Sequence, residues 1–178
     1  MSETPEAAQT PPEPAIDPAQ VAYLQQRLLS EQNLMLGVAA GAVAAVLGAA
    51  AWAGVTVASG YQIGFMAIGV GFGVGFAVRR AGRGTTSAFG MVGASFALLG
   101  CAAGNLLAVT AIVASKEGVT LLDALRSLDV ELAKRLMIAF FSPMDPLFYG
   151  LAVYEGYRLS FRQISREELD GMLSGGAG

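Results

Sequence analysis

The sequence predicts an all-α membrane protein, a bundle of four transmembrane helices with an amphipathic surface helix between the third and the fourth. Two observations support this prediction. Of the 178 residues, 54% are hydrophobic and only 14% are charged, whereas a soluble domain carries roughly 25% charged residues. No charged residue occurs between Glu31 and Arg79, or between Arg83 and Lys116. Uncharged apolar runs of about 18 residues or more are typical of segments that cross a bilayer.

The composition also argues against several kinds of chemistry. The chain has no histidine, which is the commonest general base and a usual zinc ligand. Its single cysteine, Cys101, can form neither an intramolecular disulfide nor a cysteine metal cluster. We therefore expect no catalytic residue, no metal site and no cofactor. The net charge of −3 comes without a basic cluster of the kind that binds nucleic acid.

Two segments precede the membrane domain. Residues 1–17 hold four of the seven prolines and no basic residue, so we expect a disordered acidic tail rather than a secretory signal. Asp17 followed by Pro18 is typical of a helix start. Residues 18–33 should form an amphipathic helix beside the membrane, because one stripe carries Val21, Leu24 and Leu28.

The membrane domain is expected at residues 34–166, followed by a flexible tail at 167–178. Span one, at about 34–57, and span two, at about 61–78, are so close in sequence that they must form a tight hairpin. The 18 residues of span two would measure about 27 Å as a helix, just enough to cross the hydrocarbon core. Span three lies at about 88–114.

The pattern of residues 119–141 predicts an amphipathic surface helix between spans three and four. Charged residues occupy the positions between the leucines, so this helix should lie along the membrane surface or cover the ends of the spans. The leucines recur at helical spacing, at Leu121, Leu125, Leu128, Leu132 and Leu136.

Two prolines separate this surface helix from span four. Pro143 and Pro146 should end the preceding helix, because proline lacks an amide proton and clashes with the turn before it. Asp145 can then cap a new helix, which gives span four at about 146–162. The alternative is a single span that begins near Leu136 and is kinked at the prolines.

Basic residues in short loops mark the cytoplasmic side of a membrane protein. With four spans, all three groups of arginines fall on one side, so both termini are expected in the cytoplasm and the protein in the cell (inner) membrane, as a multi-pass protein. The arginines after span two should also contact lipid headgroups. The three groups are Arg27; Arg79, Arg80 and Arg83; and Arg158, Arg162 and Arg166.

The glycine-rich stretch from Gly69 to Gly84 does not fit a phosphate-binding loop. A dinucleotide loop needs G-x-G-x-x-G, but Val74 and Phe76 stand where the third glycine would fall. The glycines instead recur four apart, which lets the backbones of two helices approach closely. Those of span two should contact span one or span three. We expect helix packing at Gly69, Gly71, Gly73, Gly75, Gly100 and Gly104.

Three polar residues fall within the predicted spans. Glu155 would lie about 13 Å into span four, where a charge costs about 2.5–3.5 kcal/mol. It should face the bundle, pair or stay neutral, and Arg158, one turn away, is the expected partner. A second interpretation places both at the membrane interface, in a shorter or shifted span. Asn105 should hydrogen-bond between helices; the alternative is a place in a polar pore or ligand site.

Four segments of the chain carry a resemblance: SEQNL at 30–34, GYQIGFMAIGVGFGVGFAVR at 60–79, LLGCAAGNLL at 98–107 and SPMDPLFYGLAVYEGYRLSFR at 142–162. From about residue 20 to 165, the chain resembles a widespread uncharacterised family of small bacterial integral membrane proteins. The resemblance implies one compact four-span unit. It implies no activity, substrate or catalytic residue.

Three functions remain open. The first is a non-enzymatic membrane protein that packs with itself or with a partner membrane protein, and the glycine spacing favours it. The second is a subunit of an oligomeric channel or transporter, with Asn105 and Glu155 near a polar path. The third is a lipid-modifying enzyme, which would need Ser95 or Ser142 as nucleophile with an acidic base. The expected partners are the lipid bilayer and a second copy or another membrane protein, and no nucleic acid.

Overall fold

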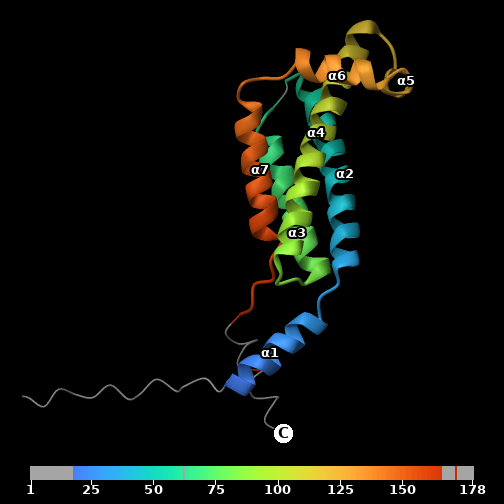
Figure 1. The fold of residues 1–178 in the computed structure, drawn as a ribbon. Coiled ribbons are helices and arrows are strands. Elements are labelled where there is room, and N and C mark those ends of the chain that lie inside the picture. Colours follow the sequence, from blue (N-terminus) through green and yellow to red (C-terminus); the bar gives the residue numbers. More distant parts are fainter. Residues whose placement is uncertain (1–17, 62, 166–170, 172–178) are drawn as a thin grey trace, which may run out of the picture. The chain divides into compact units, whose positions relative to one another are not determined.

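The computed structural model describes residues 18–61, 63–165 and 171. In this part of the chain the protein is all-helical, with seven helices and no strand (Figure 1). The predicted tail at 1–17 lies outside the described residues, as does all but Gly171 of the predicted tail at 167–178. The helices are α1 (Pro18–Ser30), α2 (Leu34–Ser59), α3 (Met66–Gly82), α4 (Ser87–Glu117), α5 (Leu121–Arg126), α6 (Val130–Ala139) and α7 (Asp145–Leu159).

The chain divides into two units, of which Glu31–Gln163 is one and holds α2 to α7. The other unit contains α1, which has no buried residue. α1 ends at Ser30, whose hydroxyl donates to the Arg27 carbonyl at 2.8 Å. The helix is therefore shorter than the predicted range of 18–33.

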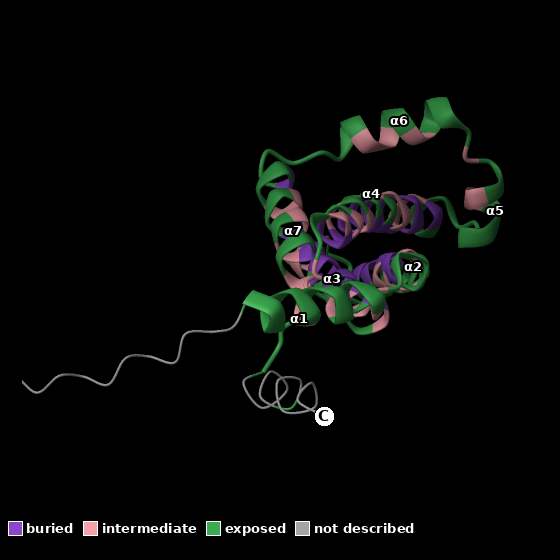
Figure 2. Cartoon of the chain, turned by 60° about the horizontal axis from the view of Figure 1, so that its bottom comes forward, coloured by how far each residue is buried: buried purple, intermediate pink, exposed green. Residues whose placement is uncertain are grey.

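Helices α2, α3, α4 and α7 pack side by side as a four-helix bundle (Figure 1). Their buried residues lie on the sides that face one another, whereas the outward sides are exposed (Figure 2). The core is made mainly of small and β-branched side chains, which let the helix axes approach closely. Larger side chains are few in it, among them Trp52 and Phe89.

The four helices differ in length. With 26 and 31 residues, α2 and α4 are about 39 and 46 Å long, whereas α3 and α7, with 17 and 15 residues, are about 26 and 22 Å long. Among the described residues, α2 and α4 are the two helices long and apolar enough to cross a membrane. Length and hydropathy alone are also compatible with the core helix of a soluble protein.

Helix α3 is displaced by about one turn from the predicted range of 61–78. Gly60 adopts a positive φ of 72° and ends α2, and Gly64 and Phe65 form a turn before α3 begins at Met66. At its other end α3 continues past Arg80, until Arg83 takes a left-handed conformation with φ of 50°. Arg79 and Arg80 therefore lie in the last turn of α3 rather than in the loop after it, and Arg83 follows as the C-cap residue.

The predicted surface helix at 119–141 is wrong as a single helix, because the structure contains α5 and α6 instead. The interruption has a local cause. Asp129 is extended (φ −92°, ψ 171°), and its carboxylate accepts from the Leu132 amide at 2.6 Å. This N-cap starts a new helix and excludes a continuous one. Thr120 caps α5 in the same way.

Helix α7 is separated from α6 by residues 140–144, so a kinked span from Leu136 is not formed. Asp145 is the first residue of α7, and its carboxylate accepts from the Ser142 amide at 2.9 Å. Pro146 follows in the first turn, where its missing amide proton costs nothing. The helix ends at Leu159, one turn short of the predicted boundary at 162.

The glycines of α3 divide into an inner and an outer pair. A β-carbon at Gly71 would lie 2.7 Å from Ala152 Cα, and one at Gly75 would lie 2.8 Å from Leu159 Cβ. Both contacts are with α7, so the expected contact with span one or span three is wrong for this pair. Gly69 and Gly73 have no atom within 4 Å of that position and are exposed.

The glycines of α4 contact three different helices. Gly104 lies against Ala49 and Trp52 of α2, and Gly100 lies against Ala45 of α2 and Val70 of α3. On another side of α4, Gly93 meets Gly156 of α7, where a β-carbon at Gly156 would lie 2.8 Å from the Gly93 carbonyl oxygen. This second contact was not predicted from the sequence.

We predict that Gly71→Leu destabilises the bundle and that Gly73→Leu does not. A side chain at position 71 must displace the α7 backbone, and overpacking of this kind typically costs about 1–3 kcal/mol. Position 73 is open, so it provides the matched control on the same helix. Folded yield and thermal stability in detergent measure the difference, and equal values for the two variants would contradict the inner-pair assignment.

Candidate functional site

A charged cluster lies at the end of the bundle where α2 begins and α7 ends; we call Glu31, Arg83 and Arg162 the charged clasp. Arg162 Nη1 donates to Glu31 Oε2 at 2.8 Å, and Arg83 Nη2 lies 3.3 Å from the same oxygen. The Arg162 side chain is only 8% exposed, whereas that of Arg83 is 54% exposed. The sequence analysis missed this pairing, although Glu31 is the last charge before the first apolar run.

Backbone hydrogen bonds hold the three segments of the charged clasp together. The Asn33 amide donates to the Gly82 carbonyl at 2.9 Å, and the Arg162 amide donates to the Gly84 carbonyl at 2.8 Å. The Asn33 side chain also caps α2, since its Oδ1 accepts from the Leu36 amide at 3.0 Å. The start of α2, the α3–α4 loop and the segment after α7 are therefore bonded to one another.

Phe89 fills the space beneath this loop. Its ring is 2% exposed and lies against the backbones of Gly37, Gly82 and Gly84. A β-carbon at Gly37 would lie 3.2 Å from the ring, and the other two positions are tighter. The close approach of the loop to α2, which the charged clasp needs, therefore depends on glycine at these positions.

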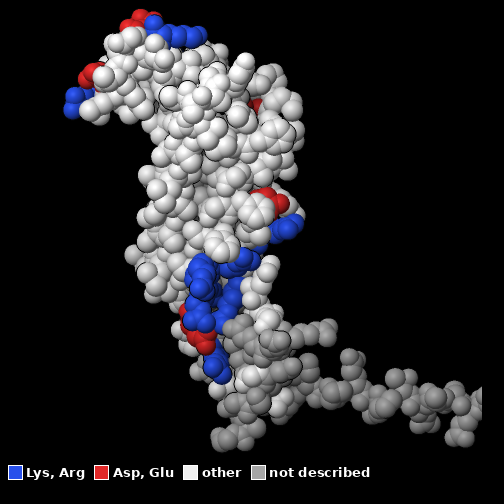
Figure 3. Space-filling view, turned by 180° about the vertical axis from the view of Figure 1, so that it is seen from behind, with Lys and Arg blue, Asp and Glu red and all other residues white. Residues whose placement is uncertain are grey.

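The remaining arginines of α3 lie at the same end of the bundle as the charged clasp. Arg79 and Arg80 are in its last turn, and the Arg79 guanidinium lies 5.3 Å from the centre of the Phe76 ring. Charged side chains gather at the two ends of the bundle, and a broad, mostly uncharged surface separates them (Figure 3). These arginines are therefore placed beside the edge of the apolar surface.

Asn105 of α4 lies in the bundle interior. It is 1% exposed, and its side chain hydrogen-bonds that of Tyr149. The Tyr149 hydroxyl also donates to the Cys101 carbonyl at 3.4 Å. Asn105 thus connects two helices, as an interhelical hydrogen-bonding residue would.

Glu155 is half-buried, and its Oε2 is buried without a hydrogen-bond partner. The expected ion pair with Arg158 is not formed within 4.0 Å. The Arg158 guanidinium instead lies 5.8 Å from the centre of the Tyr154 ring. The Glu155 backbone lies against Gly75, which is one helical turn from Arg79 on α3. Glu155 is therefore closer to the arginine-rich end of the bundle than to its middle.

Asn105 and Glu155 do not come together in one site. Asn105 bonds to Tyr149, which precedes Glu155 on α7 by six residues, or about 9 Å along the helix. Two further buried atoms without a partner, Trp52 Nε1 and Thr56 Oγ1, belong to α2. Trp52 is 1% exposed and packs against Gly104, so it is a core residue.

The described residues show no metal-binding group, and Asp145 does not activate Ser142. No cluster of three or more acidic, cysteine or histidine residues in this part of the chain could hold a metal ion. Asp145 accepts from the backbone amide of Ser142 rather than from its hydroxyl, and that hydroxyl accepts from the Met144 amide at 3.3 Å. This carboxylate is therefore oriented to stabilise the turn before α7.

We predict that Arg162→Gln lowers thermal stability more than Arg83→Gln does. Loss of the buried hydrogen bond to a charged group should cost about 1.5–3 kcal/mol, whereas the exposed Arg83 pair should contribute about 0–1 kcal/mol. Arg162→Lys keeps the charge but loses the planar guanidinium, so it should fall between Arg162→Gln and the native protein. Melting temperatures in one detergent measure the order; a larger loss for Arg83→Gln would refute the clasp as described.

Comparisons with models of protein families, with curated proteins and with solved structures find no match. The family resemblance carried by the four sequence segments therefore stays an expectation. The described residues form a glycine-packed bundle with a charged clasp at one end and few polar groups in the interior.

Proposed function

We propose that the chain is an integral membrane protein in which α2, α3, α4 and α7 all cross the bilayer, and that it acts without catalysis by packing with other membrane proteins. The observation that carries this proposal is the exposed apolar surface of the bundle. In the most apolar window of α2, only 22% of the residues are buried. Its outward side chains are large and apolar, with exposed fractions of 60% for Val43, 68% for Val46 and 64% for Leu47.

Such a surface is unfavourable in water and natural in lipid. Exposed apolar area costs about 25 cal/mol per Å² relative to burial, and soluble monomers rarely expose a continuous patch of this kind. The same type of side chain is exposed on α3 and α4, at Phe72, Phe76, Leu98 and Leu99. Lipid around the bundle would remove this cost without any further protein contact.

The short helices α3 and α7 can still take part in spanning the bilayer. Each is shorter than the hydrocarbon core of about 30 Å, but the segments before them are apolar too. Exposed apolar side chains before the two helices are those of Phe65, Phe140, Phe141 and Met144. Non-helical backbone at membrane depth requires satisfied polar groups, and turn hydrogen bonds supply some of them, such as Asp145 to Ser142.

The charges support an orientation with both termini in the cytoplasm. Arg79, Arg80, Arg83 and Arg162 are all at one end of the bundle, and basic residues concentrate on the cytoplasmic side. The opposite end carries α5 and α6, in which acidic and basic residues are mixed. Arg166 lies outside the described residues.

Assembly with a second copy would use the outer glycine pair of α3. The inner pair, Gly71 and Gly75, shows that this helix accepts another backbone at glycines four residues apart. Gly69 and Gly73 repeat that spacing on the exposed side, next to the exposed rings of Phe72 and Phe76. Close helix packing between copies would cover these rings.

A channel or transporter subunit is the alternative function. It is favoured by one observation, the buried and unbonded Glu155 Oε2, since ionisable groups in membrane helices are commonly functional. Because Asn105 lies at a different level of the bundle, a polar path through both would need more than one copy. Flux in liposomes, compared between native protein and Glu155→Gln, separates this alternative from the main proposal.

We predict that both termini face the cytoplasm. Reporters that work only inside or only outside the cell, fused in turn to each terminus and to the loop between α6 and α7, measure the orientation. The loop fusion is expected to report the outside and both terminal fusions the inside. Termini on opposite faces would eliminate the four-span arrangement, because an even number of spans returns the chain to its starting side.

We also predict that the Gly69→Leu, Gly73→Leu double variant forms smaller oligomers but keeps a folded bundle. Leucine at these positions fills the flat surface that another helix would contact, and meets nothing within the subunit. Gly54→Leu is the matched control, since Gly54 is also open and exposed but lies on α2. Native gels and light scattering measure the size. Unchanged size in the double variant argues against assembly through α3.

A further inference from the structure

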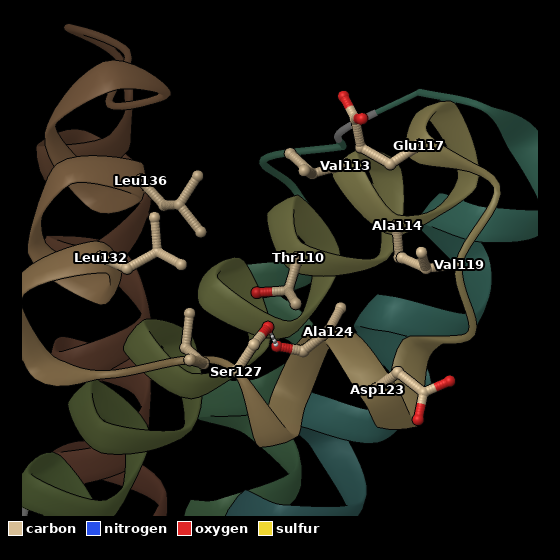
Figure 4. A pocket seen from close by; sticks show the side chains of 11 residues that line it. Thr110, Val113, Ala114, Glu117, Val119, Asp123, Ala124, Ser127, Leu132 and Leu136 are labelled. Atoms are coloured by element: carbon tan, nitrogen blue, oxygen red, sulfur yellow. Dashed lines mark hydrogen bonds between the residues drawn. The ribbon is translucent and has the colours of Figure 1, made fainter.

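A cavity of about 320 Å³ lies between the end of α4 and the helices α5 and α6 (Figure 4). Thr110, Val113 and Ala114 line it from α4, and Leu132 and Leu136 reach toward them from α6. We call this space the roof cavity. It is large enough for a ligand, since small-molecule sites typically start at about 300 Å³.

Three of the four polar side chains that line the roof cavity, those of Thr110, Asp123 and Ser127, are already bonded. The Thr110 hydroxyl donates to the Leu106 carbonyl at 2.7 Å, and the Ser127 hydroxyl donates to the Ala124 carbonyl at 2.9 Å. The carboxylates of Glu117 and Asp123 point away from the leucines (Figure 4), and Asp123 accepts from Thr120 at 2.6 Å. A polar ligand would lose its hydrogen bonds to water and gain few in return, whereas a hydrocarbon has no such bonds to lose.

No protein segment among the described residues fills the roof cavity from above. Helices α5 and α6 have no buried residue, and the helix they contact is α4. Leu132 remains 39% exposed although it lines the cavity. The apolar faces of α5 and α6 are thus held above the end of α4 with space between them.

We propose that the roof cavity holds the acyl chain of a bilayer lipid. This inference rests on the proposed membrane location, which places α5 and α6 at the outer interface and brings lipid chains beside the last turns of α4. No lysine or arginine lines the cavity to bind a phosphate, so recognition falls on the chain. Binding should therefore depend little on the headgroup.

Photo-crosslinking of the full chain in lipid vesicles tests this proposal. The probe is a phospholipid with a diazirine on its acyl chain, used once with a phosphatidylcholine and once with a phosphatidylglycerol headgroup. Mass spectrometry compares labelling of Leu128, Leu132 and Leu136 with labelling of Val43, Val46 and Leu47 on the outer face of α2. We expect the cavity residues to be labelled at least threefold more, with either headgroup.

A cavity-filling variant sharpens the test. Ala124→Phe places a ring in the roof cavity and should reduce labelling of the three leucines at least fivefold. Ala139→Phe, on the exposed end of α6 outside the lining, is the matched control and should leave labelling unchanged.

Three outcomes would overturn the proposal. Labelling of the leucines at or below the level of the α2 face refutes a bound chain, while showing that the bundle is in the bilayer. Labelling with only one of the two lipids shows headgroup recognition instead. If neither surface is labelled, the membrane location fails together with the roof cavity. The native protein alone decides these outcomes, so they do not depend on the folding of Ala124→Phe.

Discussion

Close packing of helix backbones at glycines is the constraint on which the bundle depends, and α7 shows it on two sides. Its backbone touches α3 at Gly71 and Gly75 and touches α4 at Gly93. The side-chain atoms nearest these glycines are only Leu159 Cβ and Ser160 Oγ, so van der Waals contact close to the backbones replaces the interlocking of large side chains. Because α7 has only 15 residues, this close approach compensates for a short interface.

The position of α7 also determines the charged clasp. When α7 ends against α3 and α4, the following segment reaches the α3–α4 loop, and Arg162 bonds both the Gly84 carbonyl and Glu31. The clasp therefore ties the start of the first bundle helix to the end of the last. Its charges lie outside the apolar surface, where an ion pair can be hydrated on one side and hydrogen-bonded on the other.

The opposite end of the bundle is built differently. Here α4 meets a pair of short helices with exposed apolar side chains, and no buried residue anchors α5 or α6. Short amphipathic helices of this kind are typical of the boundary between water and hydrocarbon, where one face of the helix lies in each medium. The roof cavity follows from it, because two short capped helices cannot follow the end of α4 closely.

The sequence by itself determined the helical class, the two long apolar helices and the grouping of arginines, because apolar runs and charge gaps are local properties. It also indicated that helices change at Pro143 and Pro146. It did not determine where α3 begins, since that depends on the turn at Gly64 and Phe65. Nor did it reveal the break at Asp129, where a local cap overrides the leucine repeat.

Only the tertiary structure decided which glycines are packed and which charges meet. Gly69, Gly71, Gly73 and Gly75 have the same spacing in sequence, yet only one pair faces α7, because rotation of a helix about its axis is set by its neighbours. Likewise, Arg158 is the basic residue nearest to Glu155 along the chain, yet these two side chains form no ion pair. Arg162, four residues further on, instead pairs with the distant Glu31. Contacts between distant segments depend on how the helices are placed in space, and spacing along one helix does not contain that information.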